Sequence, residues 1–512
     1  MFKDEHKRGV WDTLRQHDLQ VLFRLLPDSL ITSAAAGAGI RMGRGPLNAI
    51  TLVWLAILSA VETSKNFADV LQLVLKLLHD AQQWDGEVSP CLVRQADRRR
   101  CGAARKGKGK GKGKGKGKGK KTNQRGASAR RCKHDPRGSD PNLVSEEAFV
   151  QARKHLPAGF WVGLILLLGQ CFEREHGELL RWKKYRLLAI DGTTINLPGH
   201  PQLAKHFGKA SNQQAGKTVQ ARMVMLQFPL TRMPWRYTLA PRSQGEVTLA
   251  GPLLDQLERD DLVLMDRGYF VYGLFWRVQQ RGAYFAIRLS ASVKLKHVKH
   301  LGYKDRLVKW TPSNKKKWKQ FPPSIELRVI DYQIKGFRPS AVVTNVTDPK
   351  AISRDEWMRM AKRSEVARHL DVGLCHRRWE IETTFLELKV QQGMEGKLRG
   401  RTPQCIEYEV AGHVLLYMLT RWLMVQAAAL TDHGDCLRLS FTEATRELND
   451  LRHALLSADA KTVENYLLPL LLERIASHPV PWRPGRYDTR SRNTKVKNKG
   501  SGRYQQPSRS SK

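Results

Sequence analysis

Apolar residues recur at spacings of three and four positions through the first 95 residues and again from about residue 354 to 475. This spacing gathers them on one face of a helix, so both regions are expected to be helical. Between them the pattern changes to short, almost wholly apolar runs separated by amphipathic stretches, which is typical of buried strands alternating with helices. The predicted strands are 184–197, 221–228, 235–241, 262–266 and 283–289, and the predicted helices are 247–261 and 271–282.

Three strands followed by alternating helices and strands is the order expected of an RNase H-like α/β core. After this core, residues 293–348 are rich in lysine, and partial period-two alternation at 325–334 and 340–348 indicates further strands. The predicted fold class is therefore α/β. It combines an RNase H-like catalytic core and a β-rich insertion with a helical N-terminal domain and a helical C-terminal region.

Two of the predicted strands deliver a carboxylate after an apolar run, Asp191 in the first strand and Asp266 in the fourth. A third carboxylate, Glu382, lies on a predicted helix. Carboxylates collected from separate elements can hold Mg²⁺, which prefers oxygen ligands. A pair of such ions carries out in-line phosphoryl transfer. These three residues are therefore the candidate metal ligands and catalytic groups.

Helical phase singles out Glu382 among three nearby glutamates. At about 100° per residue, Arg378 and Glu382 lie one turn apart, and Lys389 falls about 20° from the line through Arg378. Glu380 and Glu387 lie about 200° and 180° from that line and are predicted to face the opposite way. A carboxylate between two cations suits a metal ligand beside a phosphate backbone. An i,i+4 surface ion pair explains the same spacing without any such role.

The charge of the chain indicates what kind of partner it binds. The net charge is +40 and the isoelectric point is about 10.2. Two stretches, 97–141 and 479–512, are strongly basic, and the rest of the chain is basic too. A polyanion, most commonly nucleic acid, is the expected partner; the alternative is a basic surface without one. Alternating Lys and Gly predict a disordered linker at 97–141. It either binds phosphates through its charge or is a repeat expansion in a tolerant loop.

The cysteines and the apolar runs indicate the cellular compartment in which the protein is expected. The seven cysteines include no CxxC pair, which favours reduced thiols in a cytosol over a disulfide framework or a zinc site. The first residues lack the apolar core of a signal peptide. The longest apolar runs, 47–61 and 160–169, are shorter than the roughly 18 to 20 residues that span a bilayer. Both are predicted to be buried helices, and no membrane partner is expected.

Three motifs together resemble one known family. Residues 191–193 read Asp-Gly-Thr and match its Asp-x-Thr, and residues 266–269 read Asp-Arg-Gly-Tyr and match its Asp-x-Gly-Tyr/Phe. Its third motif is Tyr, two residues, Arg, three residues, Glu, six residues, Lys; the positions are held here by Cys375, Arg378, Glu382 and Lys389. A cysteine thus replaces the tyrosine. Over about residues 142–487 the chain resembles the DDE transposases of the insertion-sequence-4 family, the hairpin-forming cut-and-paste group of bacteria.

The resemblance implies a transposase that cleaves DNA at the ends of an insertion sequence and transfers strands into a target. It implies that Asp191, Asp266 and Glu382 hold two Mg²⁺ ions, for which Mn²⁺ substitutes. It also implies that Arg378 and Lys389 contact DNA phosphates. The expected partners are double-stranded transposon ends and target DNA, bound by a homodimer in the nucleoid of a bacterial cytoplasm. The expected course is nicking, hairpin closure, hairpin opening and strand transfer.

Other interpretations stay open from the sequence. Trp310 and Trp318 are candidates for stacking on a flipped base at the hairpin, and packing in the core is the alternative. An RNase H-like nuclease would carry the same acids. An inactive or domesticated transposase-derived DNA-binding protein is the third possibility, which the cysteine at position 375 would favour.

The predicted organisation has six parts. They are a helical N-terminal domain that is a candidate for binding DNA ends (1–96), the basic Lys/Gly linker (97–141), the first part of the catalytic core (142–292), the β-strand insertion between the second and third acids (293–348), the helical remainder of the core with the Arg/Glu/Lys helix (349–478) and a basic disordered tail (479–512).

Overall fold

The structure is a computed structural model that describes most of the chain between residues 25 and 480. The described residues are 25–41, 47–61, 146–210, 218–290, 293–312, 314, 316, 318–333, 339–358, 377–458 and 460–480. The chain divides into a compact unit, Met1–Pro479, and a C-terminal unit, Val480–Lys512. Every element described below belongs to the first unit. The predicted Lys/Gly linker, Cys375 and the tail beyond residue 480 lie outside the described residues.

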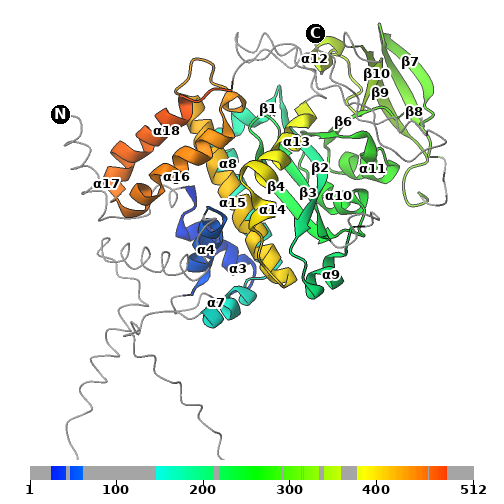
Figure 1. Ribbon diagram of the computed structural model, residues 1–512. Coiled ribbons are helices and arrows are strands. Elements are labelled where there is room, and N and C mark those ends of the chain that lie inside the picture. The colour runs from blue at the N-terminus through cyan, green and yellow to red at the C-terminus, as the bar shows by residue number, and fades with distance from the viewer. Residues whose placement is uncertain are drawn as a thin grey trace, which may run out of the picture. The chain divides into compact units, whose positions relative to one another are not determined.

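One mixed sheet runs through this unit (Figure 1). In spatial order its strands are β4 (Met233–Pro241), β3 (Val219–Phe228), β2 (Tyr185–Leu197), β5 (Asp261–Met265), β6 (Tyr284–Arg288), β10 (Ser340–Thr344), β9 (Ile325–Tyr332), β8 (Asp305–Trp310) and β7 (Lys296–Gly302), with β1 (Arg181–Trp182) paired to β2. The pairs β2–β3 and β3–β4 are antiparallel, whereas β2–β5 and β5–β6 are parallel. The prediction of a mixed α/β fold is confirmed, and each predicted strand overlaps an observed one.

The strands predicted after residue 293 continue the same sheet. β10 pairs antiparallel with β6, with Val343 opposite Ile287, and β9, β8 and β7 follow outward from it. Residues of β9 and β10 are mostly buried, while nearly every residue of the outermost strand, β7, is exposed. Lysine and histidine on β7 suit an edge strand, because charged side chains discourage pairing with another chain.

Helices surround the sheet. They are α3 (Asp28–Gly37), α4 (Ala49–Val61), α7 (Glu146–Ala152), α8 (Ala158–His176), α9 (Pro201–Phe207), α10 (Glu246–Leu254), α11 (Tyr272–Gln280), α12 (Arg354–Met358), α13 (Trp379–Leu386), α14 (Met394–Lys397), α15 (Pro403–Ala428), α16 (Phe441–Ser457), α17 (Ala460–Thr462) and α18 (Leu468–Ala476). Short 3₁₀ turns occur at Arg153–His155, Gly177–Leu180, Arg267–Tyr269 and Cys436–Arg438, and π-helical turns at Glu387–Gln391 and Val463–Leu467.

The long helix α15 is buried on all sides, as its lack of a polar face requires. It packs against α4, α8, α16 and α18. At the crossing with α4, a Cβ on Gly412 would lie 2.4 Å from the carbonyl oxygen of Ala56, so only glycine permits this approach. The hydroxyl of Tyr408 donates to the carbonyl of Leu52 at 2.8 Å. The predictions that 47–61 and 160–169 form buried helices are confirmed in α4 and α8.

In the part of the chain that the structure describes, no single helix has both the length and the apolar character needed to cross a membrane. One bent pair, Glu147–His155 with Ala158–Leu180, meets those criteria only when its two helices are taken together across a 71° bend.

Candidate active site

The three acidic residues of the sequence analysis meet around one cation, the guanidinium of Arg378. Its Nη1 lies 2.7 Å from Asp191 Oδ2, and its Nη2 lies 2.8 Å from Glu382 Oε1. Its Nε lies 3.8 Å from Asp266 Oδ1. The Arg378 side chain is only 8% exposed, while Asp266, at 47%, is the most open of the acids. Residues 75 and more positions apart in the sequence therefore form one acidic cluster with a buried cation at its centre.

Strand register brings the two aspartates together. In the parallel pair of β2 and β5, Ile190 lies opposite Met265, the last residue of β5. Asp191 directly follows Ile190 and Asp266 directly follows Met265. The two aspartates therefore lie side by side, because neighbouring strands are about 4.8 Å apart. The carboxyl end of β5 is also where an open α/β sheet offers space for a ligand.

Glu382 reaches the same place from α13. Arg378 lies in a 3₁₀ turn directly before this helix and Glu382 lies in its first turn, so one turn separates them as predicted. The assumption of an unbroken α-helix through Lys389 is wrong, because Glu387–Gln391 is a π-helical turn. A π-turn advances fewer degrees per residue, so the α-helical phase cannot be extended beyond Glu387, where the π-turn begins. Such turns occur frequently at functional sites.

Lys389 nevertheless points toward β2. Its Nζ donates to the carbonyl oxygen of Thr194 at 2.7 Å and to Thr193 Oγ1 at 3.3 Å, and it pairs with Glu395 Oε1 at 3.0 Å. Glu395 also accepts from the backbone and side-chain amides of Asn196. The lysine is therefore placed next to the segment that carries Asp191, with an acidic partner that sequence analysis did not single out.

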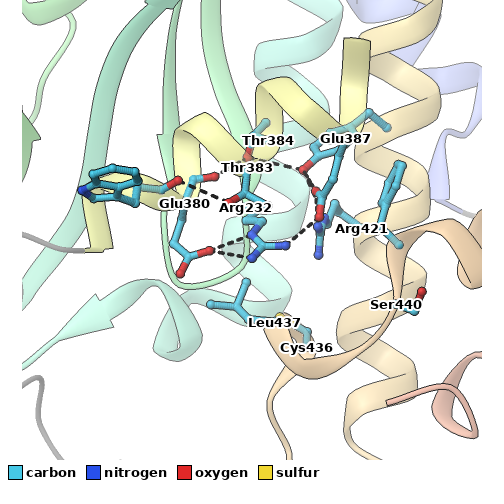
Figure 2. A network of polar contacts seen from close by, with 12 residues as sticks. Arg232, Glu380, Thr383, Thr384, Glu387, Arg421, Cys436, Leu437 and Ser440 are labelled. Atoms are coloured by element: carbon cyan, nitrogen blue, oxygen red, sulfur yellow. Dashed lines mark hydrogen bonds and ion pairs between the residues drawn. The ribbon is translucent and has the colours of Figure 1, made fainter. Parts of the chain in front are cut away.

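Glu380 and Glu387 face away from the cluster, as their helical phase predicted. They bind two other arginines, Arg232 and Arg421, as Figure 2 shows. Arg232, in the tight turn between β3 and β4, reaches Glu380 Oε2 with Nη2 at 2.7 Å and Glu387 Oε1 with Nη1 at 2.6 Å. Glu387 Oε2 accepts from Arg421 and, at 2.7 Å, from the hydroxyl of Tyr417. The network joins α13 to the β3–β4 turn and to α15.

This second network is buried, and its negative charges are matched by positive ones. Glu387 is 3% exposed and Arg421 is fully buried. Burial by itself would raise the pKa of the Glu387 carboxyl, but the charges of Arg421 and Arg232 outweigh burial and hold that pKa below its usual value. Glu387 is therefore ionised, and its two arginines fix the start of the π-turn that carries Lys389.

The environment of Asp191 raises the pKa of its carboxyl, whereas that of Glu387 lowers the pKa. Burial raises the pKa of its carboxyl to about 6, and the charges of Asp266 and Glu382 add to this effect. Arg378 and a hydrogen bond from the Gly192 amide, 2.8 Å from Asp191 Oδ1, lower the pKa but offset only part of the rise. A carboxylate that gains from an added positive charge is a suitable ligand for a cation.

The donor set fits a divalent metal ion in its chemistry. Three carboxylates from separate elements lie around one cationic group, and hard cations such as Mg²⁺ prefer such oxygen donors. Among the described residues, no set of three His, Cys, Asp or Glu side chains is already closed into metal-binding geometry. The guanidinium of Arg378 lies between the acids that would form one.

The two tryptophans of the insertion pack against other aromatic rings. Trp310, 8% exposed, lies edge-on to Phe270 and Phe275, with ring centroids 5.0 and 5.3 Å away. Trp318 is half-buried and lies 6.2 Å from Tyr272 by ring centroids. The packing interpretation therefore describes Trp310, and stacking on a base stays a prediction for Trp318.

Comparison with known proteins agrees with these motifs. A family model described as "Transposase DDE domain" matches residues 182–419, which contain the acidic cluster and Lys389. The chain is 25% identical over 366 residues to the transposase InsG for insertion sequence element IS4 of Escherichia coli (strain K12), covering 68% of this chain and 79% of the relative. It is 26% identical over 143 residues to the putative transposase InsZ of the same organism, covering 28% of this chain and 48% of the relative.

A solved structure, the cryo-EM piggyBac transposase synaptic complex with hairpin DNA, is similar at 11% identity and a TM-score of 0.29. The similarity covers 68% of this chain and 67% of that chain.

The matched range and the aligned length define the class as DDE transposases, DNA-binding enzymes that cleave DNA and transfer its strands. Within that class the chain is similar to the transposase of insertion sequence element IS4, which agrees with the insertion-sequence-4 resemblance of its motifs. The identification made from the three sequence motifs is confirmed. Members of this class generally use divalent metal ions, which agrees with the chemistry of the acidic cluster.

Proposed function

We propose that Asp191, Asp266 and Glu382 are the catalytic carboxylates of this transposase and together hold its divalent ions. The observation that carries the proposal is their convergence on Arg378 from three separate elements. Two Mg²⁺ ions, for which Mn²⁺ substitutes, suit three oxygen-donor side chains. When bound, these ions would polarise the scissile phosphate and neutralise charge on the attacking and leaving oxygens.

The strand order supports an RNase H-like core for this site. β4, β3 and β2 form an antiparallel set, and β5 and β6 continue from β2 in parallel. On this proposal the core comprises residues 142–292 and 349–478. Strands β7 to β10 form the insertion 293–348, joined to the core at β6. The proposal also keeps the N-terminal residues 1–96 as a domain that binds DNA ends.

Arg378 and Lys389 are proposed to contact DNA phosphates close to the scissile bond. Arg378 has a planar fork that can serve two oxygens at once, as it does now for Asp191 and Glu382. Lys389 offers a point charge beside Thr194. Both cations lie next to the acids, where the negative charge of a phosphate would develop during reaction.

Replacing Arg378 with lysine is expected to slow DNA cleavage about tenfold to a hundredfold. Lysine keeps the charge but cannot hold two carboxylates in parallel, and a hydrogen bond to a charged group contributes about 1.5–3 kcal/mol. Single-turnover cleavage and DNA affinity should be measured together. Arg377→Lys is the matched control, because the neighbouring arginine pairs with Glu380. Equal rates for the two variants would contradict the role given to Arg378.

The whole reaction is proposed to follow nicking, hairpin closure and opening at the transposon end, and strand transfer into target DNA. One acidic cluster per DNA end requires two protomers, so a homodimer on DNA is proposed. A bacterial cytoplasm, with the protein associated with the nucleoid, is the proposed location.

The proposed function can be tested with the purified full chain and two labelled duplexes, one carrying the terminal sequence of its own element and one unrelated. With Mg²⁺ or Mn²⁺, only the first is expected to give nicks, hairpins and joined products, and EDTA should abolish all of them. Cleavage of both duplexes alike would indicate a nuclease. Binding without any cleavage would indicate an inactive DNA-binding protein.

A further inference from the structure

Glu246 lies beside the acidic cluster, although none of the three motifs includes it. It is the first residue of α10, which packs on β2, β3 and β4. Its side chain lies against Gly192, the residue that follows Asp191. A Cβ on Gly192 would lie 2.5 Å from Glu246 Cγ and 2.6 Å from its Cδ. Glycine at this position of β2 therefore admits the glutamate to the strand next to Asp191, a use that an isolated glycine in a strand often has.

One oxygen of Glu246 pairs with an arginine, and among the described residues the other makes no hydrogen bond or ion pair. Arg222, on β3, pairs with Oε1. The side chain is 34% exposed, so it is open to solvent and to ions. Arg222 lies opposite Thr194 in the β2–β3 ladder, which fixes the carboxylate over the same stretch of β2 that Lys389 contacts. The glutamate is thus held in place by a cation on the neighbouring strand.

Tyr269 gives an independent indication that a ligand belongs here. The residue is 2% exposed, and its hydroxyl has no hydrogen-bond partner among the described residues. Tyr269 ends the turn that directly follows Asp266. Burial raises the pKa of its phenol, and the charges of Asp191 and Glu246 raise that pKa further. A buried donor without an acceptor is costly, and a water carried by a divalent cation could accept from this hydroxyl.

We propose that Glu246 is a fourth carboxylate of the catalytic centre and binds a divalent cation together with Asp191. The inference rests on the proposed function of Asp191 as a metal ligand. A second carboxylate beside Asp191 supplies additional negative charge and further oxygen donors, which a hard cation needs. Arg222 then acts as a positioning residue for Glu246, and Gly192 provides the space.

Binding of Mn²⁺ to the full-length protein, followed by the EPR signal of the free ion, tests this without any DNA cleavage. Glu246→Gln is expected to weaken Mn²⁺ binding at least about tenfold, the lower end of the cost of losing a group that supports a metal site. Gly192→Ala should weaken binding as well, because it keeps every carboxylate but pushes Glu246 aside. Glu443→Gln is the matched control, a first-turn glutamate of α16 that is 28% exposed and pairs with Arg446.

The outcomes separate this inference from the function on which it rests. Weakened binding in Glu246→Gln and Gly192→Ala, with Glu443→Gln like wild type, supports the fourth carboxylate. Wild-type binding in Glu246→Gln together with loss of binding in Asp191→Asn overturns it and leaves the proposed function intact, since Glu246 then serves only Arg222. Wild-type binding in Asp191→Asn overturns both. Thermal unfolding of each variant confirms that it is folded, and Gly192→Ala carries the test if Glu246→Gln does not fold.

Discussion

Asp191→Asn is expected to reduce DNA strand cleavage about a thousandfold while leaving the fold intact. Asparagine has nearly the same shape and can still accept the hydrogen bond from the Gly192 amide. It removes the negative charge that faces Arg378 and that is proposed to hold a metal ion. Metal ions supply several kcal/mol to the transition state of such reactions, and each 1.36 kcal/mol is about tenfold in rate.

The same substitution should not lower the melting temperature. The pKa of Asp191 is raised from 3.8 to about 6 in the folded protein. The folded state therefore binds a proton more tightly than the unfolded state, and stability falls as pH rises between these values. Above pH 6 asparagine removes this unfavourable contribution.

Single-turnover cleavage and thermal unfolding should be measured for Asp191→Asn and for Asp255→Asn, an aspartate that pairs with Arg277 outside the cluster. A variant that loses stability along with activity would show that Asp191 acts mainly in folding. An unchanged cleavage rate would contradict its catalytic role.

Glu387→Ala is expected to destabilise the protein by about 3–5 kcal/mol, the usual cost of removing one partner from a buried ion pair. Arg421, fully buried, would keep only the hydroxyl of Tyr417 as a polar partner in the network, and Arg232 would keep only Glu380. The loss should be seen as a lower melting temperature and a lower denaturant midpoint. Activity should fall as well, because Glu387 begins the π-turn that positions Lys389.

Two further variants test this prediction. Glu443→Ala removes the i,i+3 partner of the largely exposed Arg446 and should cost less than about 1 kcal/mol. Replacing both Glu387 and Arg421 with methionine should cost less than Glu387→Ala, because the fully buried charge of Arg421 is then removed together with its partner, while Arg232 keeps Glu380. If Glu387→Ala cost no more than Glu443→Ala, the network of Figure 2 would have no part in holding α13.

The three candidate acids and the strands that carry two of them could be predicted because their signals are local. Apolar runs ending in Asp191 and Asp266 mark buried strands, and the turn between Arg378 and Glu382 is a property of any helix. The helical phase also separated Glu382 from Glu380 and Glu387, since both of these face the second network. The resemblance to a family could be seen from the same short motifs, each of which is local in the sequence.

Two features of the site could be seen only in the tertiary structure, because they depend on contacts between segments far apart in the sequence. The register that sets Ile190 opposite Met265 is a choice between strands 75 residues apart, and it alone makes the two aspartates neighbours. The π-turn after Leu386 follows from packing, because Glu387 is held by arginines from β3–β4 and α15. Periodicity cannot show such a turn, since it assumes one rise and one angle per residue.

The sequence by itself determined the candidate residues for the chemistry, because residue type and local spacing are enough to select them. The tertiary structure decided how they are arranged: three acids around one buried arginine, Lys389 on the backbone of β2, and Glu246 admitted beside Asp191 by the absence of a side chain at Gly192. A glycine in the sequence shows only that space is possible, whereas the fold determines which side chain fills it.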